Sequence, residues 1–202
     1  MSGKDFMRLR RLSVRRKLAR VNKAELRTEM RARLRSPELG REEKSRALNA
    51  VLAAHRAFQR SISIALFSPL PVEPALDLFA ERGDRRFCFP LIRAGEIVLI
   101  RVDSPDELLP SEWHPHIREP AFRSERVVQP NELDLVIVPG LAFTATGARL
   151  GRGGGFYDRL LAKLSPRTVR FGVCFSLQLV SELPLEPHDQ LLDAVITEDG
   201  VA

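Results

Sequence analysis

DLVIVPGLAFTATGARLGRGGGFYDRLL, residues 134–161, joins an apolar run, a glycine-rich loop and the start of a helix. The run from Asp134 to Val138 predicts a buried strand. The loop after it carries eight glycine and arginine residues: Gly140, Gly147, Arg149, Gly151, Arg152, Gly153, Gly154 and Gly155. Phe156 to Leu164 then predicts a helix, with Asp158 in its first turn. This order places backbone amides and positive charge where a phosphate can bind.

The glycines allow two interpretations. In one, the backbone turns with positive φ and lies against a ligand that a Cβ atom would block. In the other, the segment is a mobile surface loop. The buried strand directly before it and the aromatic residues directly after it favour the first interpretation. The loop is not a Walker A motif, because no Gly-Lys-Ser/Thr sequence closes it, and it lacks the spacing of a Rossmann fingerprint.

Composition indicates a globular protein without a membrane span. The 202 residues are 44% hydrophobic, which is enough for one core. No stretch approaches about 18 consecutive apolar residues. The two cysteines, Cys88 and Cys174, lie in apolar segments, so we expect small core side chains in a reducing compartment, with a disulfide as the lesser alternative.

Charge is concentrated at the N-terminus. Residues 1–35 hold 13 Lys or Arg and three acids, a net charge of +10, whereas the whole chain carries +6, so the other 167 residues carry −4. We therefore treat residues 1–22 as a basic extension and 23–202 as a single domain. A cytoplasmic protein is the default expectation; an organellar import signal or a later start codon are the alternatives.

The rest of the chain alternates helices and strands. We expect helices over 23–35, over about 37–58 and over 75–82, and a helical turn at 176–181. Strands are expected over 61–67, 86–92, 96–102, 168–175 and 193–197, with a hairpin turn at Ala94-Gly95. Uniformly apolar strands alternating with helices predict an α/β fold, with a mostly parallel sheet covered by helices on both faces. Ligands in such folds bind at the carboxyl ends of the strands.

The glycine loop resembles the signature of the 5-formyltetrahydrofolate cyclo-ligase family. That pattern reads Pro-Gly-x-x-Phe, then Gly-x-Arg-Leu-Gly-x-Gly-x-Gly-aromatic-Tyr-Asp. It is matched in order by twelve residues: Pro139, Gly140, Phe143, Gly147, Arg149, Leu150, Gly151, Gly153, Gly155, Phe156, Tyr157 and Asp158. Thr144 replaces a common Asp, and Phe156 replaces a common Tyr. The resemblance covers roughly residues 22–198 and implies a sheet architecture like that of the NagB/RpiA/CoA transferase group, preceded by two helices.

Flanking segments extend the resemblance. Lys23 and Arg27 fit the Lys-x-x-x-Arg that opens the family's first helix, and Glu73 fits a Glu after the first strand. Ile117, Glu119 and Pro120 match an Ile-x-Glu-Pro segment. Near the C-terminus, the Pro-x-x-x-His-Asp pattern and a later Asp are met by Pro184, His188, Asp189 and Asp193.

The resemblance implies an enzyme that uses ATP and Mg²⁺ to convert 5-formyltetrahydrofolate into 5,10-methenyltetrahydrofolate. It implies catalytic roles for Arg149 and Tyr157, metal ligands at Asp158 and Asp189, and folate contacts at Glu73, Trp113 and Tyr157. The implied nucleotide-binding residues are Lys23, Arg27, Arg149, Leu150, Gly151, Arg152, Gly153, Gly154, Gly155, Phe156 and Tyr157. Carboxylates suit Mg²⁺ and arginine suits phosphate, so these residue types agree with that chemistry.

Two other functions stay open at this point. The RGGGF sequence and the basic extension would suit an RNA-binding module, although a single RGG unit after a buried strand argues against it. Another enzyme on a similar sheet, or an inactive paralogue that still binds nucleotide, is the second alternative. We expect a monomer with a small-molecule substrate and neither a nucleic acid nor a membrane partner.

Overall fold

The structure, a computed structural model, describes residues 22–112, 114 and 116–202. The basic extension up to residue 21 and Trp113 therefore lie outside the described residues. The helices are α2 (Lys23–Leu34), α3 (Arg41–Ala54), α4 (Arg56–Arg60) and α5 (Phe156–Leu161). The strands are β1 (Ser63–Ala65), β2 (Arg86–Arg93), β3 (Glu96–Val102), β4 (Leu108–Pro110), β5 (Arg118–Pro120), β6 (Val127–Val128), β7 (Leu135–Val138), β8 (Ala142–Phe143), β9 (Arg149–Leu150), β10 (Val169–Val173), β11 (Ala194–Thr197) and β12 (Gly200–Val201).

Helix α2 forms where the sequence predicts it. The side chain of Asn22 accepts a hydrogen bond from the backbone N–H of Glu25 at 2.9 Å, which caps the first turn. Met30 and Leu34 bury the inner face, and basic residues occupy the last turn.

The second predicted helix is divided. Pro37–Leu39 forms a 3₁₀ turn, and Gly40 at φ +64° then begins α3. The chain is extended at His55, whose Nδ1 atom accepts from the N–H of Ala57 at 3.1 Å and begins α4. A continuous helix over 37–58 is therefore wrong, because two residues leave the helical region of φ and ψ.

The predicted helix over 75–82 is also wrong, since the segment contains only a 3₁₀ turn at Phe79–Glu81. Its backbone instead forms hydrogen bonds with a side chain of α3. Asn49 donates to the carbonyl of Ala75 at 2.8 Å and accepts from the N–H of Asp77 at 3.2 Å. Polar groups on α3 therefore satisfy the backbone that a helix would have satisfied internally.

Eight strands form one sheet in the order β12-β11-β10-β7-β1-β2-β3-β6. The pairings from β11 through β10, β7 and β1 to β2 are parallel, and the outer pairings are antiparallel. The hairpin of β2 and β3 turns at Ala94 and Gly95, both with positive φ, as predicted. The α/β fold with a mostly parallel central sheet is thus confirmed.

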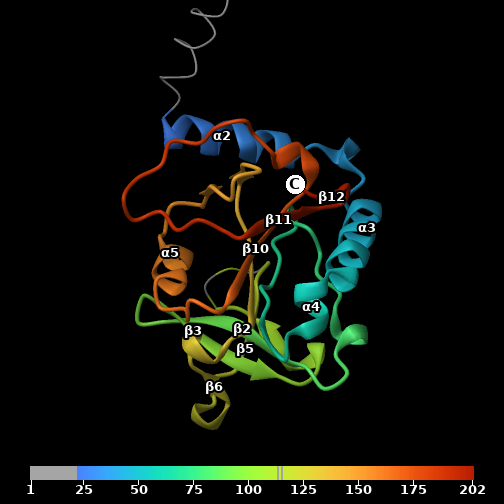
Figure 1. Ribbon diagram of the computed structural model, residues 1–202, viewed down its shortest axis with the longest axis vertical. Coiled ribbons are helices and arrows are strands. Elements are labelled where there is room, and N and C mark those ends of the chain that lie inside the picture. The colour runs from blue at the N-terminus through green and yellow to red at the C-terminus, as the bar shows by residue number, and fades with distance from the viewer. Residues whose placement is uncertain (1–21, 113, 115) are drawn as a thin grey trace, which may run out of the picture.

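Both faces of the sheet are covered by helices. Side chains alternate along each strand, so Leu135 and Ile137 pack with α3 and α4, whereas Val136 and Val138 pack with α5. Figure 1 shows α3 and α4 on one side of the sheet and α5 on the other. Cys88 and Cys174 are buried and unpaired, as expected for small core side chains.

Helix α2 lies across the carboxyl edge of the sheet instead of on a face (Figure 1). Its Met30 and Leu34 pack against Leu141, Ala142 and Leu150 of the short hairpin β8–β9. The glycine-rich loop is therefore held between a buried strand and a helix from the other end of the chain.

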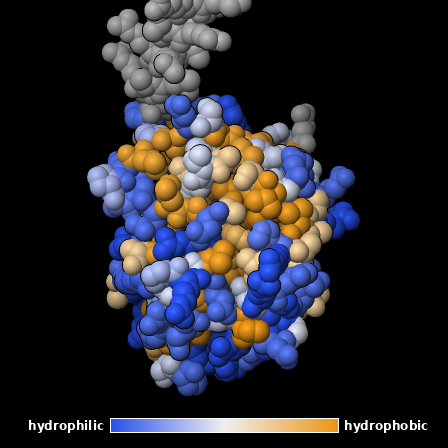
Figure 2. Space-filling view, in the orientation of Figure 1, coloured by the Kyte–Doolittle hydropathy of each residue, from blue (hydrophilic) through white to orange (hydrophobic). Residues whose placement is uncertain are grey.

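Apolar side chains are unevenly distributed over the surface. In the orientation of Figure 2, apolar surface gathers toward the end of the molecule where α2 lies, and the end with the β2–β3 hairpin is mostly hydrophilic. Within the described residues, no helix is both long and apolar enough to cross a membrane.

Candidate active site at the carboxyl edge of the sheet

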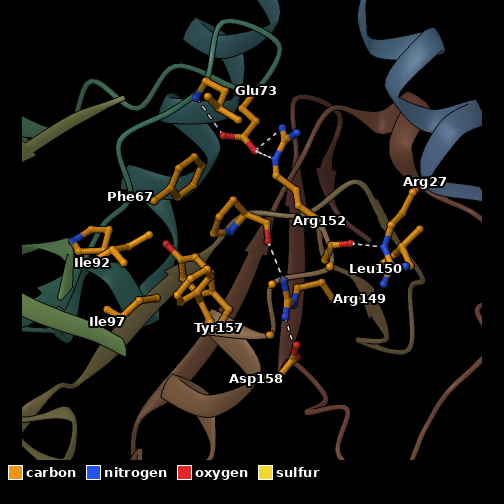
Figure 3. Close-up of a pocket in the computed structure, with 18 of the residues that line it drawn as sticks. Arg27, Phe67, Glu73, Ile92, Ile97, Arg149, Leu150, Arg152, Tyr157 and Asp158 are labelled. Atoms are coloured by element: carbon orange, nitrogen blue, oxygen red, sulfur yellow. Dashed lines mark hydrogen bonds and ion pairs between the residues drawn. The ribbon is translucent and has the colours of Figure 1, made fainter. Parts of the chain in front are cut away.

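A cavity of about 360 Å³ opens at the carboxyl edge of the sheet. The segments after β1, β7 and β9 line it, together with α2 and the loop before β11. In Figure 3, Arg27, Arg149 and Arg152 lie on one side, Phe67, Ile92 and Ile97 lie on the other, and Tyr157 lies between them. The cavity therefore has a charged half and an apolar half.

Every sequence-predicted site residue that the structure describes lines this cavity: Lys23, Arg27, Glu73, Arg149, Leu150, Gly151, Arg152, Gly153, Gly154, Gly155, Phe156, Tyr157, Asp158 and Asp189. Trp113, the remaining predicted residue, lies outside the described part of the chain. Segments more than 160 residues apart thus meet at one site.

The glycine loop has unused backbone donors. Among the described residues, none of the N–H groups from Gly151 to Gly155 donates a hydrogen bond. Gly153 and Gly155 have φ of +112° and +66°, a region that favours glycine. The loop ends at the first turn of α5, where more N–H groups point outward from the helix. This arrangement can bind an anion.

Arg149 is buried beside the loop, with its side chain only 4% exposed. Its Nη2 donates to Oδ1 of Asp158 at 2.7 Å and its Nη1 to the carbonyl of Pro139 at 3.2 Å. Asp158 and Pro139 fix the guanidinium, while its buried Nε–H makes no hydrogen bond to any described residue.

Glu73 forms a second buried ion pair. Its Oε1 accepts from Nε and Nη2 of Arg152 at 3.0 and 2.7 Å, and its Oε2 accepts from the N–H of Leu70 at 2.9 Å. The side chain of Glu73 is 5% exposed, whereas that of Arg152 is 35% exposed. This pair joins the proline-rich loop after β1 to the glycine loop.

Tyr157 lies at the centre of the cavity and packs against the apolar clusters on both faces of the sheet. Burial raises the pKa of its hydroxyl well above the usual value, and nearby Glu73 adds to the rise while Arg149 opposes it. The hydroxyl therefore remains protonated at neutral pH and can donate a hydrogen bond.

Lys23 connects α2 to the C-terminal loop. Its Nζ lies 2.6 Å from Oδ2 of Asp189 and 3.1 Å from Oε2 of Glu186. Burial alone would raise the pKa of Asp189, but the hydrogen bonds from Lys23 and the Glu186 N–H, together with the charges of Lys23 and His188, outweigh it and lower that pKa. Burial likewise would lower the pKa of Lys23, but Asp189 and Glu186 together raise it. Both groups are charged at neutral pH.

The acidic residues offer donors for a cation. Asp158 and Asp189 both border the cavity, and Glu186, His188 and Asp189 place one ligand atom each within 4.8 Å of one another. Carboxylate oxygens are the donors that Mg²⁺ prefers. The donor set fits Mg²⁺, although Asp158 and Asp189 are each paired with a basic side chain here.

Sequence reasoning missed the apolar half of the cavity. Its lining includes Leu70, Pro90, Ile92, Ile97 and Ile117, from the proline loop, the β2–β3 hairpin and the chain before β5. Apolar residues predict only burial, so no signal in the sequence marked them as lining a cavity, apart from Ile117 in its matching segment. Glu119, on β5, also lines the cavity and was noted only as part of a matching segment.

Two polar residues outside the cavity shape the loop. Gln178 is fully buried, donates to the carbonyls of Gly140 and Leu141 and accepts from the N–H of Phe175. Thr144, at the position where an Asp is common, accepts from the N–H of Ala148 at 3.1 Å and so closes the β8–β9 turn. Its substitution affects the turn and not the cavity lining.

Comparison with known proteins identifies the family. The model of the 5-formyltetrahydrofolate cyclo-ligase family matches residues 19–198. The chain belongs to this family. A mouse (Mus musculus) 5-formyltetrahydrofolate cyclo-ligase is 30% identical over 90% of this chain and 97% of its own length.

Two other similar proteins are also named as enzymes of this family. The NMR structure of Aquifex aeolicus 5,10-methenyltetrahydrofolate synthetase superposes with a TM-score of 0.74 at 32% identity, covering 89% of this chain and 91% of that one. An Arabidopsis thaliana 5-formyltetrahydrofolate cyclo-ligase named as mitochondrial is 41% identical over 38% of this chain and 32% of its own length.

Proposed function

We propose that this chain is an ATP-dependent 5-formyltetrahydrofolate cyclo-ligase, which forms 5,10-methenyltetrahydrofolate, ADP and phosphate. The observation that carries the proposal is the run of N–H groups from Gly151 to Gly155, which line the cavity and donate no hydrogen bond to any described residue. A phosphate donor and a flat, partly apolar substrate can bind there side by side.

The reaction needs the formyl oxygen to become a leaving group. Transfer of the ATP γ-phosphoryl group to that oxygen breaks the bond to ADP and forms an N5-iminium phosphate, in which the carbon stays bonded to N5. Folate N10 then attacks that carbon, the phosphate departs with its bonding electrons and takes up the N10 proton, and the imidazolinium ring closes. No side-chain nucleophile is required, so the protein must align two ligands and neutralise phosphate charge.

Residues of the charged half suit that task. The loop amides would hold the phosphate oxygens, with Leu150 and Phe156 at the ends of the loop and Lys23 and Arg27 reaching the nucleotide from α2. Arg149 has a buried donor that no described residue occupies. We assign it to the transferring phosphoryl group, where an arginine stabilises the charge that develops.

Asp158 and Asp189 would hold Mg²⁺, which would neutralise nucleotide phosphate charge when bound. The carboxylates of both residues border the cavity. Glu186 and His188 lie beside Asp189 and would orient it.

The folate would occupy the apolar half. The rings of Tyr157 and Phe67 border it, and Ile92 and Ile97 close it. Tyr157 stays protonated at neutral pH, so we assign it to stacking and hydrogen-bond donation instead of proton abstraction. Glu73 would bind pterin nitrogens, and Trp113 completes the proposed substrate contacts.

For the rest of the chain, we propose a monomeric cytoplasmic enzyme with residues 23–202 as one domain and 1–22 as an extension outside the site. An organellar location is the alternative, and no nucleic-acid partner is proposed. Deleting residues 1–20 should leave catalysis near the full-chain value.

The test is an absorbance assay at the methenyltetrahydrofolate band with purified full-length protein, 5-formyltetrahydrofolate, Mg²⁺ and ATP. Growth of the band that requires both ATP and Mg²⁺ supports the proposal. Folded protein that binds ATP without forming product would instead indicate an inactive paralogue.

A further inference from the structure

Helix α2 contacts the glycine loop at two successive carbonyl groups. Nε of Arg27 donates to the carbonyl of Gly151 at 3.0 Å, and Nη2 of Arg31 donates to the carbonyl of Arg152 at 3.2 Å. Arg27 and Arg31 are four residues apart, so they share one face of the helix. Lys23 lies one turn earlier and contacts Asp189. Arg31 does not line the cavity and matched no family motif in the sequence.

These contacts fix two peptide groups. In a trans peptide the N–H group points opposite to the preceding carbonyl, and the described chain has no cis peptide bonds. The two arginines hold the carbonyls of Gly151 and Arg152, so the N–H groups of Arg152 and Gly153 point away from those guanidinium groups. Both N–H groups are among those of residues 151–155 that donate no hydrogen bond to any described residue.

A glycine loop without such contacts could rotate these peptides. Gly151 and Gly153 flank Arg152, and glycine adopts positive and negative φ about equally well. A flipped peptide would turn a carbonyl oxygen toward the phosphate and repel it. Charged donors hold a carbonyl more strongly than neutral ones do.

We propose that Arg31 is a positioning residue for the nucleotide site, which orients the Arg152–Gly153 peptide so that its N–H faces the ligand. The proposal rests on the proposed function, because it takes the glycine loop to be the phosphate-binding element. Docking of α2 does not require Arg31, because fully buried Met30 and Leu34 pack the helix against the β8–β9 hairpin.

The test compares three variants in the full chain. Arg31→Met keeps much of the side-chain length and removes the donors, and Arg31→Lys keeps the charge and one donor site. Arg33→Ala is the matched control, because Arg33 is exposed on the same helix and, among the described residues, its side chain pairs only with Glu29. Each variant is assayed for kcat, for KM toward ATP and 5-formyltetrahydrofolate, for binding of a non-hydrolysable ATP analogue, and for Tm.

We expect Arg31→Met to raise the KM for ATP and the Kd of the analogue by about tenfold, the scale of one hydrogen bond to a charged donor. The KM for folate should change by less than about twofold on that basis, because the lost bond is on the nucleotide side. Arg31→Lys should recover much of the loss, and Arg33→Ala should match the wild type.

Unchanged ATP affinity in Arg31→Met would overturn the proposal. So would a fall in Tm and kcat with both KM values unchanged, because that pattern indicates a purely structural role. If the wild type binds the analogue but forms no product, the proposed function fails, and the analogue affinities still decide the role of Arg31.

Discussion

Nζ of Lys23 lies 2.6 Å from Oδ2 of Asp189, so a cation from the first helix and an acid from the C-terminal loop neutralise each other at the cavity. Arg149 with Asp158 and Arg152 with Glu73 repeat this arrangement. The groups proposed for phosphate are thus paired with the groups proposed for Mg²⁺ or folate. A ligand that binds one member of such an ion pair must take the place of the other member. A cation bound to Asp189 would therefore release Lys23 to bind a phosphate.

Asp189→Asn tests this exchange. We expect it to bind metal-free ATP more tightly than the wild type does, because Lys23 loses a charged partner. Mg²⁺-dependent turnover should fall by at least about a hundredfold, the scale of losing one electrostatic group at a reacting centre. Titration calorimetry with and without Mg²⁺, and the absorbance assay, measure the two effects.

The matched control for Asp189→Asn is Glu182→Gln, which removes an exposed carboxylate that does not line the cavity. It should behave as the wild type. If Asp189→Asn bound metal-free ATP no better than the wild type, Lys23 would not be available to the nucleotide.

The same pair predicts a pH dependence of stability. The pKa of Asp189 is lowered in the folded protein, so its stabilisation is fully present above the unfolded-state pKa and is lost as pH falls through the lower folded value. The difference in unfolding free energy between the wild type and Asp189→Asn should therefore be present from pH 5 to 8 and shrink below about pH 4. Urea unfolding at several pH values measures it; a difference that grows in acid would contradict the pairing.

The parts of the site that lie close together in sequence were predictable from composition and order alone, and those assembled by tertiary contacts were not. The strand, the glycine loop and Asp158 follow one another within a single segment, so composition and order predicted them. The family resemblance supplied Lys23, Glu73 and Asp189. Ile92 and Ile97 line the cavity only because the β2–β3 hairpin packs beside the loop, and Gln178 orients Gly140 from 38 residues away.

The errors in the predicted secondary structure have a similar cause. The residues over 75–82 have reasonable helix propensity, but hydrogen bonds with the side chains of Asn49 and Ser45 hold Ala75 and Asp77 in another conformation. Propensity is a weak prior that tertiary hydrogen bonds override. Fold class was predictable because it depends on the overall alternation of apolar strands and helices.

Gly147→Ala should strongly destabilise the protein. Gly147 has φ +86°, and a Cβ atom there would lie 2.1 Å from the carbonyl oxygen of Leu192, a backbone atom. We expect a loss of about 2–4 kcal/mol of unfolding free energy from strain and overpacking.

Gly40→Ala is the control for Gly147→Ala, since Gly40 has φ +64° and open space around its Cβ position. The Gly40→Ala variant should lose only about 1 kcal/mol of unfolding free energy. Equal losses in the two variants, measured by urea unfolding, would show that the contact with Leu192 does not matter.

Cys88 and Cys174 should resist thiol reagents in the folded protein. Burial raises the pKa of the Cys88 thiol to about 12, and burial also raises the pKa of Cys174 well above its usual value. The reactive thiolate is therefore scarce at pH 8. A disulfide-exchange reagent should label neither residue in native protein and both in urea. Rapid labelling of native protein would contradict their burial.

The pair of Glu73 and Arg152 supplies the final prediction. Glu73 is almost fully buried, so removing its partner with Arg152→Met leaves a buried carboxylate whose one remaining hydrogen bond within the described chain is from the N–H of Leu70. Breaking a fully buried ion pair lowers the unfolding free energy by about 3–5 kcal/mol. Because Arg152 is partly exposed, we expect a loss of about 1–2 kcal/mol here. Adding Glu73→Gln removes the unpaired charge, so the double variant should be more stable than Arg152→Met alone. A double variant less stable than Arg152→Met would show that Glu73 is stabilised independently of Arg152, and urea unfolding decides between the two.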